Sequence, residues 1–140
     1  MTIVVAAGII ERDHRILATR RKKGSHLELH WEFPGGKLEA HESPEECLAR
    51  ELREELGVTV APGRILDVVF HRYPESSVLL LFYECTLTDG EPRALDCDAF
   101  RWVPRAELPS LEWAPADLEF VAKLAADTPI VPGERPLSQR

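Results

Sequence analysis

Apolar and polar positions divide the chain into short extended runs and two helical stripes. The run 3–10 is continuously apolar and rich in β-branched residues, which predicts a strand buried on both faces. Polar or proline- and glycine-containing turns are expected at 11–14, 61–63 and 73–77. Between these turns the pattern predicts further strands over 15–20, 31–33, 65–71, 78–87 and 99–103.

The first helix has clear start and stop signals. Ser43 can cap its N-terminus, and proline at the first helical position is followed by a glutamate three residues after the cap, Glu46. Gly57 is the expected left-handed stop. These signals predict a helix of about 13 residues with an apolar stripe, formed by Leu48, Leu52 and Leu56.

A second amphipathic helix is expected from Pro115 onward, because apolar residues recur there at i, i+3, i+4 and i+7. Those positions are Leu118, Val121, Ala122 and Ala125. A mixed sheet covered by two helices gives an α/β (α+β) sandwich. We expect one domain over 1–128 and a loosely ordered tail over 129–140, which is proline-rich and has little to bury.

Composition narrows the functional classes. The formal charge of −7 argues against binding of a nucleic-acid polymer, whose partners carry a basic surface. Three cysteines without a CxxC pair indicate a reducing, cytoplasmic setting. The apolar run 3–10 is too short to span a bilayer and lacks the pattern of a signal peptide. We therefore expect no membrane partner.

The first helix carries an excess of negative charge on one side. Glu51, Glu54 and Glu55 stand at i, i+3 and i+4 and fall within an arc of roughly 100°. Their mutual repulsion can be offset in two ways. The three can form a solvated face paired with Arg50 and Arg53, or they can share a divalent cation such as Mg²⁺ or Mn²⁺, which prefers oxygen ligands.

The surrounding spacing resembles the box of the Nudix hydrolases. The pattern G-x5-E-x7-R-E-U-x-E-E-x-G-U, with U aliphatic, is met at every fixed position. The matching residues are Gly36, Glu42, Arg50, Glu51, Leu52, Glu54, Glu55, Gly57 and Val58. The likeness to MutT-type members runs from about Val4 to Leu124, and it implies an α/β/α sandwich around a mixed sheet.

The resemblance also implies roles for the box residues. Glu51, Glu54 and Glu55 would be the metal ligands, with the backbone carbonyl of Gly35 completing the set. Glu51 or Glu54 would be the base for the attacking water, and Arg50 would orient the glutamates. Glu42 would either close the junction before the helix or act only as a favourable charge at its N-terminus.

Residues outside the box are open to two interpretations each. Asp96 lies six residues before Trp102, where many MutT-type members carry a further metal-binding carboxylate, but it also fits an ordinary loop acid. Candidates for binding the nucleotide are Arg21, Glu32, Phe33, Tyr73 and Asp117. Asp117 stands where members specific for oxidised guanine use asparagine. An ionised aspartate only accepts hydrogen bonds, so it would suit a base edge rich in donors, such as that of guanine or cytosine. Alternatively, it is simply a favourable negative charge at the N-terminus of a helix.

The resemblance implies Mg²⁺-dependent hydrolysis (Mn²⁺ being the other candidate ion) of a nucleoside or deoxynucleoside triphosphate to the monophosphate and pyrophosphate. Oxidised triphosphates such as 8-oxo-dGTP are among the candidate substrates. One alternative is a hydrolase of ADP-ribose or another substituted nucleoside diphosphate, and another is a domain that senses nucleotides without cleaving them. The sequence leaves monomer and homodimer equally open.

Overall fold

The computed structural model describes residues 1–126, so the tail expected over 129–140 lies outside the described part. A seven-stranded sheet has the order β3-β2-β1-β6-β5, with β4 paired to β1 and β7 to β2. The strands β1 and β6 run parallel and the other pairs are antiparallel, so the sheet is mixed, as expected. The strands are β1 (Thr2–Arg12), β2 (Arg15–Arg20), β3 (Trp31–Glu32), β4 (Gly35–Lys37), β5 (Thr59–Arg72), β6 (Ser77–Asp89) and β7 (Ala99–Pro104).

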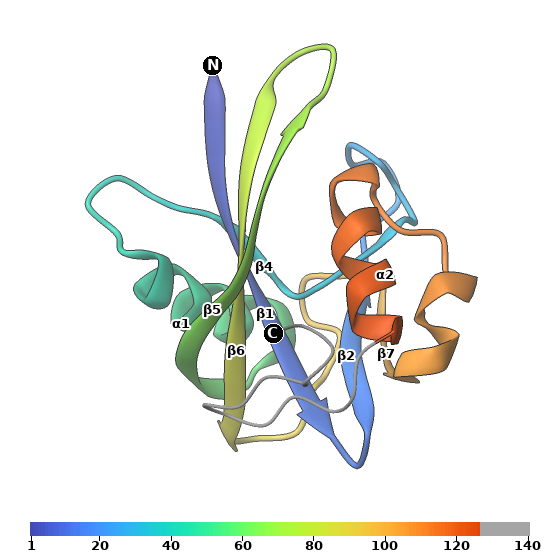
Figure 1. Cartoon of the computed structure of the whole chain (residues 1–140). Coiled ribbons are helices and arrows are strands. Elements are labelled where there is room, and N and C mark those ends of the chain that lie inside the picture. The colour runs from blue at the N-terminus through green and yellow to red at the C-terminus, as the bar shows by residue number, and fades with distance from the viewer. Residues whose placement is uncertain (127–140) are drawn as a thin grey trace.

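Helices cover the sheet on both faces, which gives the α/β/α layering (Figure 1). Helix α1 (Pro44–Leu56) packs on one face and α2 (Leu118–Ala126) on the other, preceded by the short helices η1 (Arg105–Ser110) and η2 (Pro115–Asp117). Strand β1 serves both cores, because its side chains alternate between the faces. Ala7 and Ile9 pack in the cluster with α2, whereas Ala6 and Ile10 pack in the cluster with α1.

Helix α1 forms as its sequence signals predict. It has 13 residues, and Ser43 and Glu46 make the reciprocal capping bonds of a capping box. Gly57 adopts φ 70° and its N–H donates to the carbonyls of Arg53 and Leu52. The predicted leucine stripe is fully buried against the sheet. The helix is therefore fixed in length and rotation, which decides where its carboxylates point.

We expect Ser43→Ala to lower the free energy of unfolding by about 1 kcal/mol, because the N–H of Glu46 loses its acceptor. For a domain of this size that corresponds to a fall in the melting temperature of about 3–5 °C. Thermal unfolding followed by circular dichroism measures the change. Ser43→Thr keeps an acceptor oxygen and should recover most of the loss. Equal melting temperatures for all three proteins would contradict the capping role.

Two sequence-based expectations were wrong in detail. The turn expected at 61–63 lies inside β5, where register shifts between Thr59 and Asp67 absorb the proline and glycine as bulges without ending the strand. The stripe expected on the last helix is rotated: Leu118 is 54% exposed, and Phe120, Val121 and Leu124 are the buried residues. The first turn of that segment is the separate helix η2. Phe120 and Leu124 turn inward with Val121, and Phe120 stacks on Phe82 with 4.1 Å between the ring centroids.

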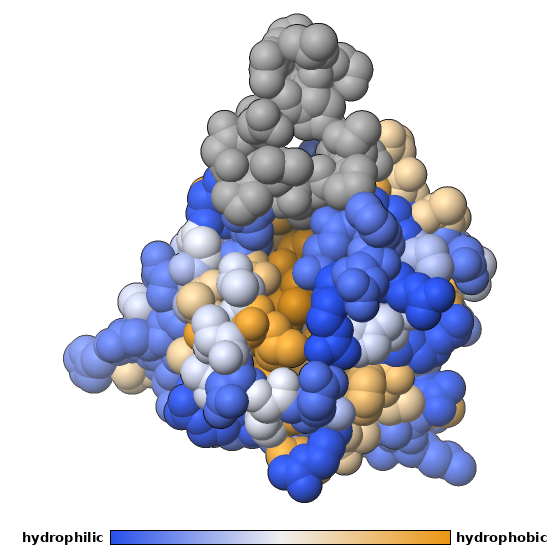
Figure 2. Space-filling model, turned by 90° about the horizontal axis from the view of Figure 1, so that it is seen from below, coloured by the Kyte–Doolittle hydropathy of each residue, from blue (hydrophilic) through white to orange (hydrophobic). Residues whose placement is uncertain are grey.

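The surface is mostly hydrophilic on the face drawn in Figure 2, where apolar side chains gather in a central hollow.

Cys47 and Cys85 are buried free thiols and Cys97 is a partly buried one. Burial raises the pKa of Cys47 and of Cys85 to about 12, so both are protonated small apolar side chains at neutral pH. Over the described residues, no helix combines the length and apolar character needed to cross a membrane.

Candidate active site

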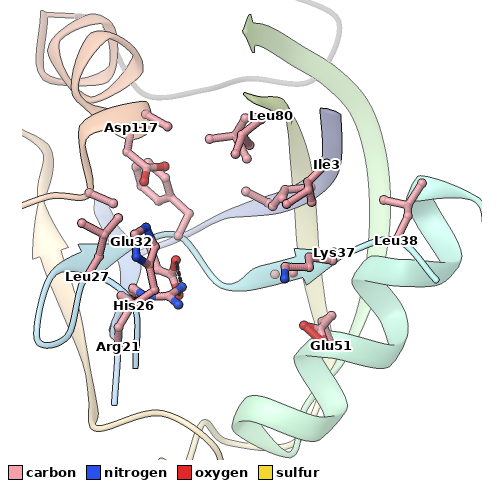
Figure 3. A pocket seen from close by; sticks show the side chains of 18 of the residues that line it. Ile3, Arg21, His26, Leu27, Glu32, Lys37, Leu38, Glu51, Leu80 and Asp117 are labelled. Carbon is pink, nitrogen blue, oxygen red and sulfur yellow. Dashed lines mark hydrogen bonds and ion pairs between the residues drawn. The ribbon is translucent and has the colours of Figure 1, made fainter. Parts of the chain in front are cut away.

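A cavity of about 1010 Å³ opens between the layer of α1 and the layer of η2 and α2. In Figure 3, Glu51 on α1 stands at one end and Asp117, Glu32 and Arg21 stand at the other, with Lys37 between them. The floor consists of outward side chains of β1 and β6, where alternation along each strand presents apolar residues to one face. These floor residues are Ile3, Val5, Val78 and Leu80.

Glu51 lies directly over the glycine pair of β4. A methyl group added to Gly36 would stand 1.8 Å from Oε2 of Glu51, so the glycine is what leaves room for the carboxylate. Gly35 pairs with Ala7 and Gly36 with Ala6, which holds the backbone of β4 against β1. The glycines thus let the carboxylate of α1 approach the sheet more closely than any other residue type would permit.

Arg50 holds several carboxylates in place. Its Nη1 donates to Glu51 at 2.9 Å and to Glu54 at 3.2 Å. Its Nε and Nη2 donate to Glu42 at 2.7 and 2.9 Å, and Nη2 also donates to the carbonyl of Lys37 at 3.1 Å. The arginine lowers the pKa of Glu42 to about 2. Glu42 thereby ties the loop before the helix to the carboxylate cluster.

Glu55 is turned toward the interior. Its Oε1 accepts a hydrogen bond from the N–H of Gly35 at 3.2 Å. Burial, followed by the charges of Glu32 and Glu51, raises its pKa well above the usual value. Burial also raises the pKa of Glu51. Arg50 acts to lower this pKa, and the neighbouring Glu54 acts to raise it further. Two carboxyls whose pKa values are raised chiefly by burial, and further by neighbouring glutamates, mark a place where added positive charge is stabilising.

The donor set fits a divalent cation. Carboxylate oxygens from successive turns of one helix, close to a backbone turn, are the ligands that Mg²⁺ selects. Within the described residues, no three acidic, histidine or cysteine side chains converge as a ready ligand cluster. The Glu54 side chain is 53% exposed and accepts a hydrogen bond from Arg50, whereas the Glu51 side chain is 17% exposed. Loading an ion therefore requires the side chains to turn toward one another.

Asp96 is brought near this cluster by the backbone. The N–H groups of Leu95 and Asp96 both donate to the carbonyl of Glu55, at 2.9 and 3.1 Å. The Asp96 side chain pairs with Nζ of Lys22 at 2.5 Å, and both groups are more than half exposed. Neither Glu54 nor Asp96 is among the described residues that line the cavity. Both remain predicted ligands.

The five predicted nucleotide contacts all line the cavity. Arg21 donates to Glu32 through Nη1 at 3.1 Å and to the carbonyl of His26 through Nε at 2.6 Å. Phe33 is 3% exposed and packs on Trp113 at 4.7 Å between ring centroids. Phe33 thus belongs to the core as well as to the cavity wall.

Asp117 and Tyr73 form the inner end of the cavity. The N–H of Ala116 donates to the Tyr73 hydroxyl at 3.2 Å, which joins the tip of the β5–β6 hairpin to η2. Asp117 is 4% exposed, and no hydrogen bond from another described residue reaches its carboxylate. Burial, followed by the charge of Glu32, raises the pKa of Asp117 well above its usual value. A largely buried acid with a raised pKa in the wall of a cavity is a candidate for ligand binding.

Sequence reasoning missed part of the wall. Residues 6–10 are buried on both faces, as predicted for the first run. Its first part, which includes Ile3 and Val5, is less buried and contributes to the cavity floor. His26 and Lys37 also line the cavity, and the sequence carries no periodic signal for either. The ring of His26 lies edge-on to that of Tyr73, with 5.9 Å between the ring centroids.

Comparison with known proteins places residues 1–124 in one family. The family model "NUDIX domain" matches residues 1–124. The putative 8-oxo-dGTP diphosphatase 2 of Mycobacterium tuberculosis (strain CDC 1551 / Oshkosh) is 42% identical over 123 residues, which are 87% of each chain. The CTP pyrophosphohydrolase of Escherichia coli (strain K12) is 36% identical over 126 residues, or 89% of this chain and 92% of that one.

A solved structure agrees with the sequence comparison. The solution structure of the E. coli ORF135 protein superposes with a TM-score of 0.75 at 34% identity and covers 86% of both chains. The match therefore extends over sheet, helices and cavity rather than over the glutamate-rich helix alone.

Proposed function

The chain belongs to the Nudix hydrolase family, and on that premise we propose that it is a divalent-ion-dependent pyrophosphohydrolase of nucleoside triphosphates. The substrate is a nucleoside or deoxynucleoside triphosphate, and the products are the monophosphate and pyrophosphate. One observation carries the proposal: a single cavity has carboxylates of α1 at one end and the polar side chains of Arg21, Glu32 and Asp117 at the other. The names of the two relatives, an 8-oxo-dGTP diphosphatase and a CTP pyrophosphohydrolase, support the same substrate class.

The reaction needs an aligned water and neutralised phosphate oxygens. A bound divalent cation supplies charge neutralisation and lowers the pKa of a coordinated water. Glu51, Glu54 and Glu55 are the residues proposed to hold it, with Gly35 and Asp96 as further candidates. Mg²⁺ is the proposed ion, and Mn²⁺ is the alternative that the same oxygen ligands accept.

Glu51 is the better placed of the two candidate bases. Glu51 lines the cavity, whereas the side chain of Glu54 is exposed to solvent and paired with Arg50. Its carboxylate takes a proton from the water, the water oxygen bonds to phosphorus, and the phosphoanhydride bond breaks with pyrophosphate leaving. The raised pKa of Glu51 suits this role, because a base is most effective when its pKa approaches the working pH.

The other end of the cavity is proposed to bind the nucleoside. Val5, Val78 and Leu80 offer an apolar floor for the flat face of a base. Glu32 and Asp117 offer acceptors for ring and amino N–H groups, and Arg21 fixes Glu32. Guanine presents two adjacent donors, N1–H and N2–H₂, and cytosine presents its amino group. Either base complements this edge better than thymine does.

Asp117→Asn should have two opposite effects. It replaces an acceptor with a group that also donates, so we expect kcat/KM for the preferred triphosphate to fall by about 10–100-fold. It also removes a buried acid whose pKa is raised on folding, a group that destabilises the folded state as the pH rises through that pKa. The variant should therefore be more heat-stable than the parent at neutral pH and lose that advantage in acid.

Steady-state kinetics and thermal unfolding from acid to neutral pH measure both effects. Glu119→Gln is the matched control, since Glu119 is an exposed acid two residues further along the same segment. An unchanged kcat/KM for Asp117→Asn across all triphosphates would contradict a role in binding the base.

A substrate panel under Mg²⁺ tests the proposal as a whole. Canonical and oxidised triphosphates, ADP-ribose and dinucleoside polyphosphates are compared by kcat/KM. A triphosphate should be the best substrate. Faster turnover of ADP-ribose than of any triphosphate would instead identify a hydrolase of substituted nucleoside diphosphates.

A further inference from the structure

Strand β5 forms an open edge of the sheet. Within residues 1–126 it pairs only with β6, so the N–H and C=O groups on its other side have no partner strand. Its register shifts all lie between Thr59 and Asp67. From Asp67 to Arg72 the pairing with β6 is regular, residue for residue. Bulges commonly protect exposed edges from pairing, and this stretch has none.

The same stretch exposes apolar side chains. Val68 and Phe70 are each 50% exposed and stand two residues apart, so they share one face. Both lie opposite apolar residues of β6, Val68 beside Leu81 and Phe70 beside Leu79. In Figure 1 this end of the β5–β6 hairpin extends past the helices. An apolar strip therefore follows an unpaired backbone edge.

One hydrogen bond shows which backbone groups face outward. The N–H of Val68 donates to Oδ1 of Asp67 at 2.8 Å, so it takes no part in the ladder with β6. Backbone groups alternate in direction along an antiparallel strand. The N–H and C=O groups of Val68, Phe70 and Arg72 therefore point away from the sheet, where another strand can reach them.

We propose that this edge binds a second copy of the same chain, in antiparallel pairing of the two Asp67–His71 stretches about Val69. This register is self-complementary. It places Val68 opposite Phe70 of the second copy twice, on the exposed apolar face. On the other face it places Asp67 opposite His71 of the second copy, so a carboxylate meets an imidazole N–H. Lys123 already holds Oδ2 of Asp67 at 2.8 Å and keeps that side chain on this face.

The pairing is small and therefore concentration-dependent. Five residues from each strand bury less than the roughly 1,200–2,000 Å² that is typical of stable interfaces. The N–H of Val68 must also exchange Asp67 for a carbonyl of the second strand. The expected dimer is a weak one that leaves the body of each copy unchanged.

The interface adjoins the proposed substrate site. The His71 ring packs on Tyr73 with 4.5 Å between centroids, and Tyr73 in turn bonds to Ala116 beside Asp117. Pairing at 67–71 thus holds the end of the strand that leads to Tyr73 in the cavity wall.

Sedimentation velocity of the full chain, from about 1 µM to about 1 mM, tests the proposal. The parent should shift from monomer to dimer over this range, and Phe70→Lys should remain monomeric throughout. Leu95→Lys is the matched control, because Leu95 is 52% exposed but lies away from the edge, and it should dimerise like the parent. A parent that stays monomeric throughout, or a Phe70→Lys variant that dimerises like the parent, would overturn the proposal.

Cross-linking tests the register. Val69 faces itself across the axis as a non-hydrogen-bonded pair, where Cα atoms stand about 4.5 Å apart, within disulfide range. Val69→Cys should give a covalent dimer on mild oxidation, and Leu95→Cys should not. A dimer that forms without cross-linking at position 69 would place the contact elsewhere and overturn this pairing.

Discussion

Glu51→Gln should lower kcat by about 10²–10⁴-fold, the usual contribution of a positioned general base. The substitution keeps the size of the side chain and its place over Gly36, but it removes the charge and the ability to take a proton. It also relieves repulsion within the cluster, since Glu51 raises the pKa of Glu55. Stability should therefore be retained while turnover is lost.

The pH profile distinguishes a base from a merely structural carboxylate. Glu51 must be ionised to accept a proton, and burial with the charge of Glu54 raises its pKa. Activity of the parent should therefore fall on acidification at a higher pH than a solvent-exposed glutamate would give, and this limb should disappear in Glu51→Gln. Glu45→Gln, at an exposed position of the same helix, serves as control. Near-parental turnover by Glu51→Gln would contradict its role as base.

Gly36→Ala should reduce kcat/KM by about 100-fold or more, because a Cβ at this position would lie 1.8 Å from Oε2 and 2.5 Å from Cδ of Glu51. The carboxylate must move, and displacements of about 1 Å at reacting groups cost on this scale. The backbone of Gly36 needs no positive φ, so the fold itself should tolerate alanine.

A double variant shows whether the glycine acts through Glu51. If it does, Gly36→Ala combined with Glu51→Gln should be little worse than Glu51→Gln alone. Additive losses would mean that Gly36 affects catalysis by another route. Circular dichroism confirms that each variant is folded before its kinetics are compared.

The first helix was predictable because its determinants are local. Cap, proline, leucine stripe and glycine stop lie within fifteen residues of one another, and the structure confirms each of them. The turn expected at 61–63 failed because pairing with β6 overrides local turn preference and converts it into a bulge. The stripe predicted for α2 was wrong in phase because Phe120 and Leu124 offer more apolar surface to the core than Ala122 and Ala125, and Phe120 stacks on Phe82.

The site was predictable in its chemistry and less so in its shape. Spacing placed the glutamates on one side of α1, but only the tertiary structure shows that Glu51 and Glu55 face the cavity while Glu54 rests on Arg50. Asp117 and Glu32 stand 85 positions apart in the sequence, so no periodic pattern could reveal that their charges interact. Such contacts follow from the order of strands, which local patterns do not determine.

Product analysis with and without Mg²⁺ tests the central claim most directly. The purified chain is incubated with 8-oxo-dGTP, dGTP and CTP, with either the ion or a chelator present, and the phosphorus-containing products are identified. The account predicts monophosphate and pyrophosphate in equal amounts, formed only when the ion is present. Nucleoside diphosphate with inorganic phosphate, or tight binding of every triphosphate without turnover, would contradict it.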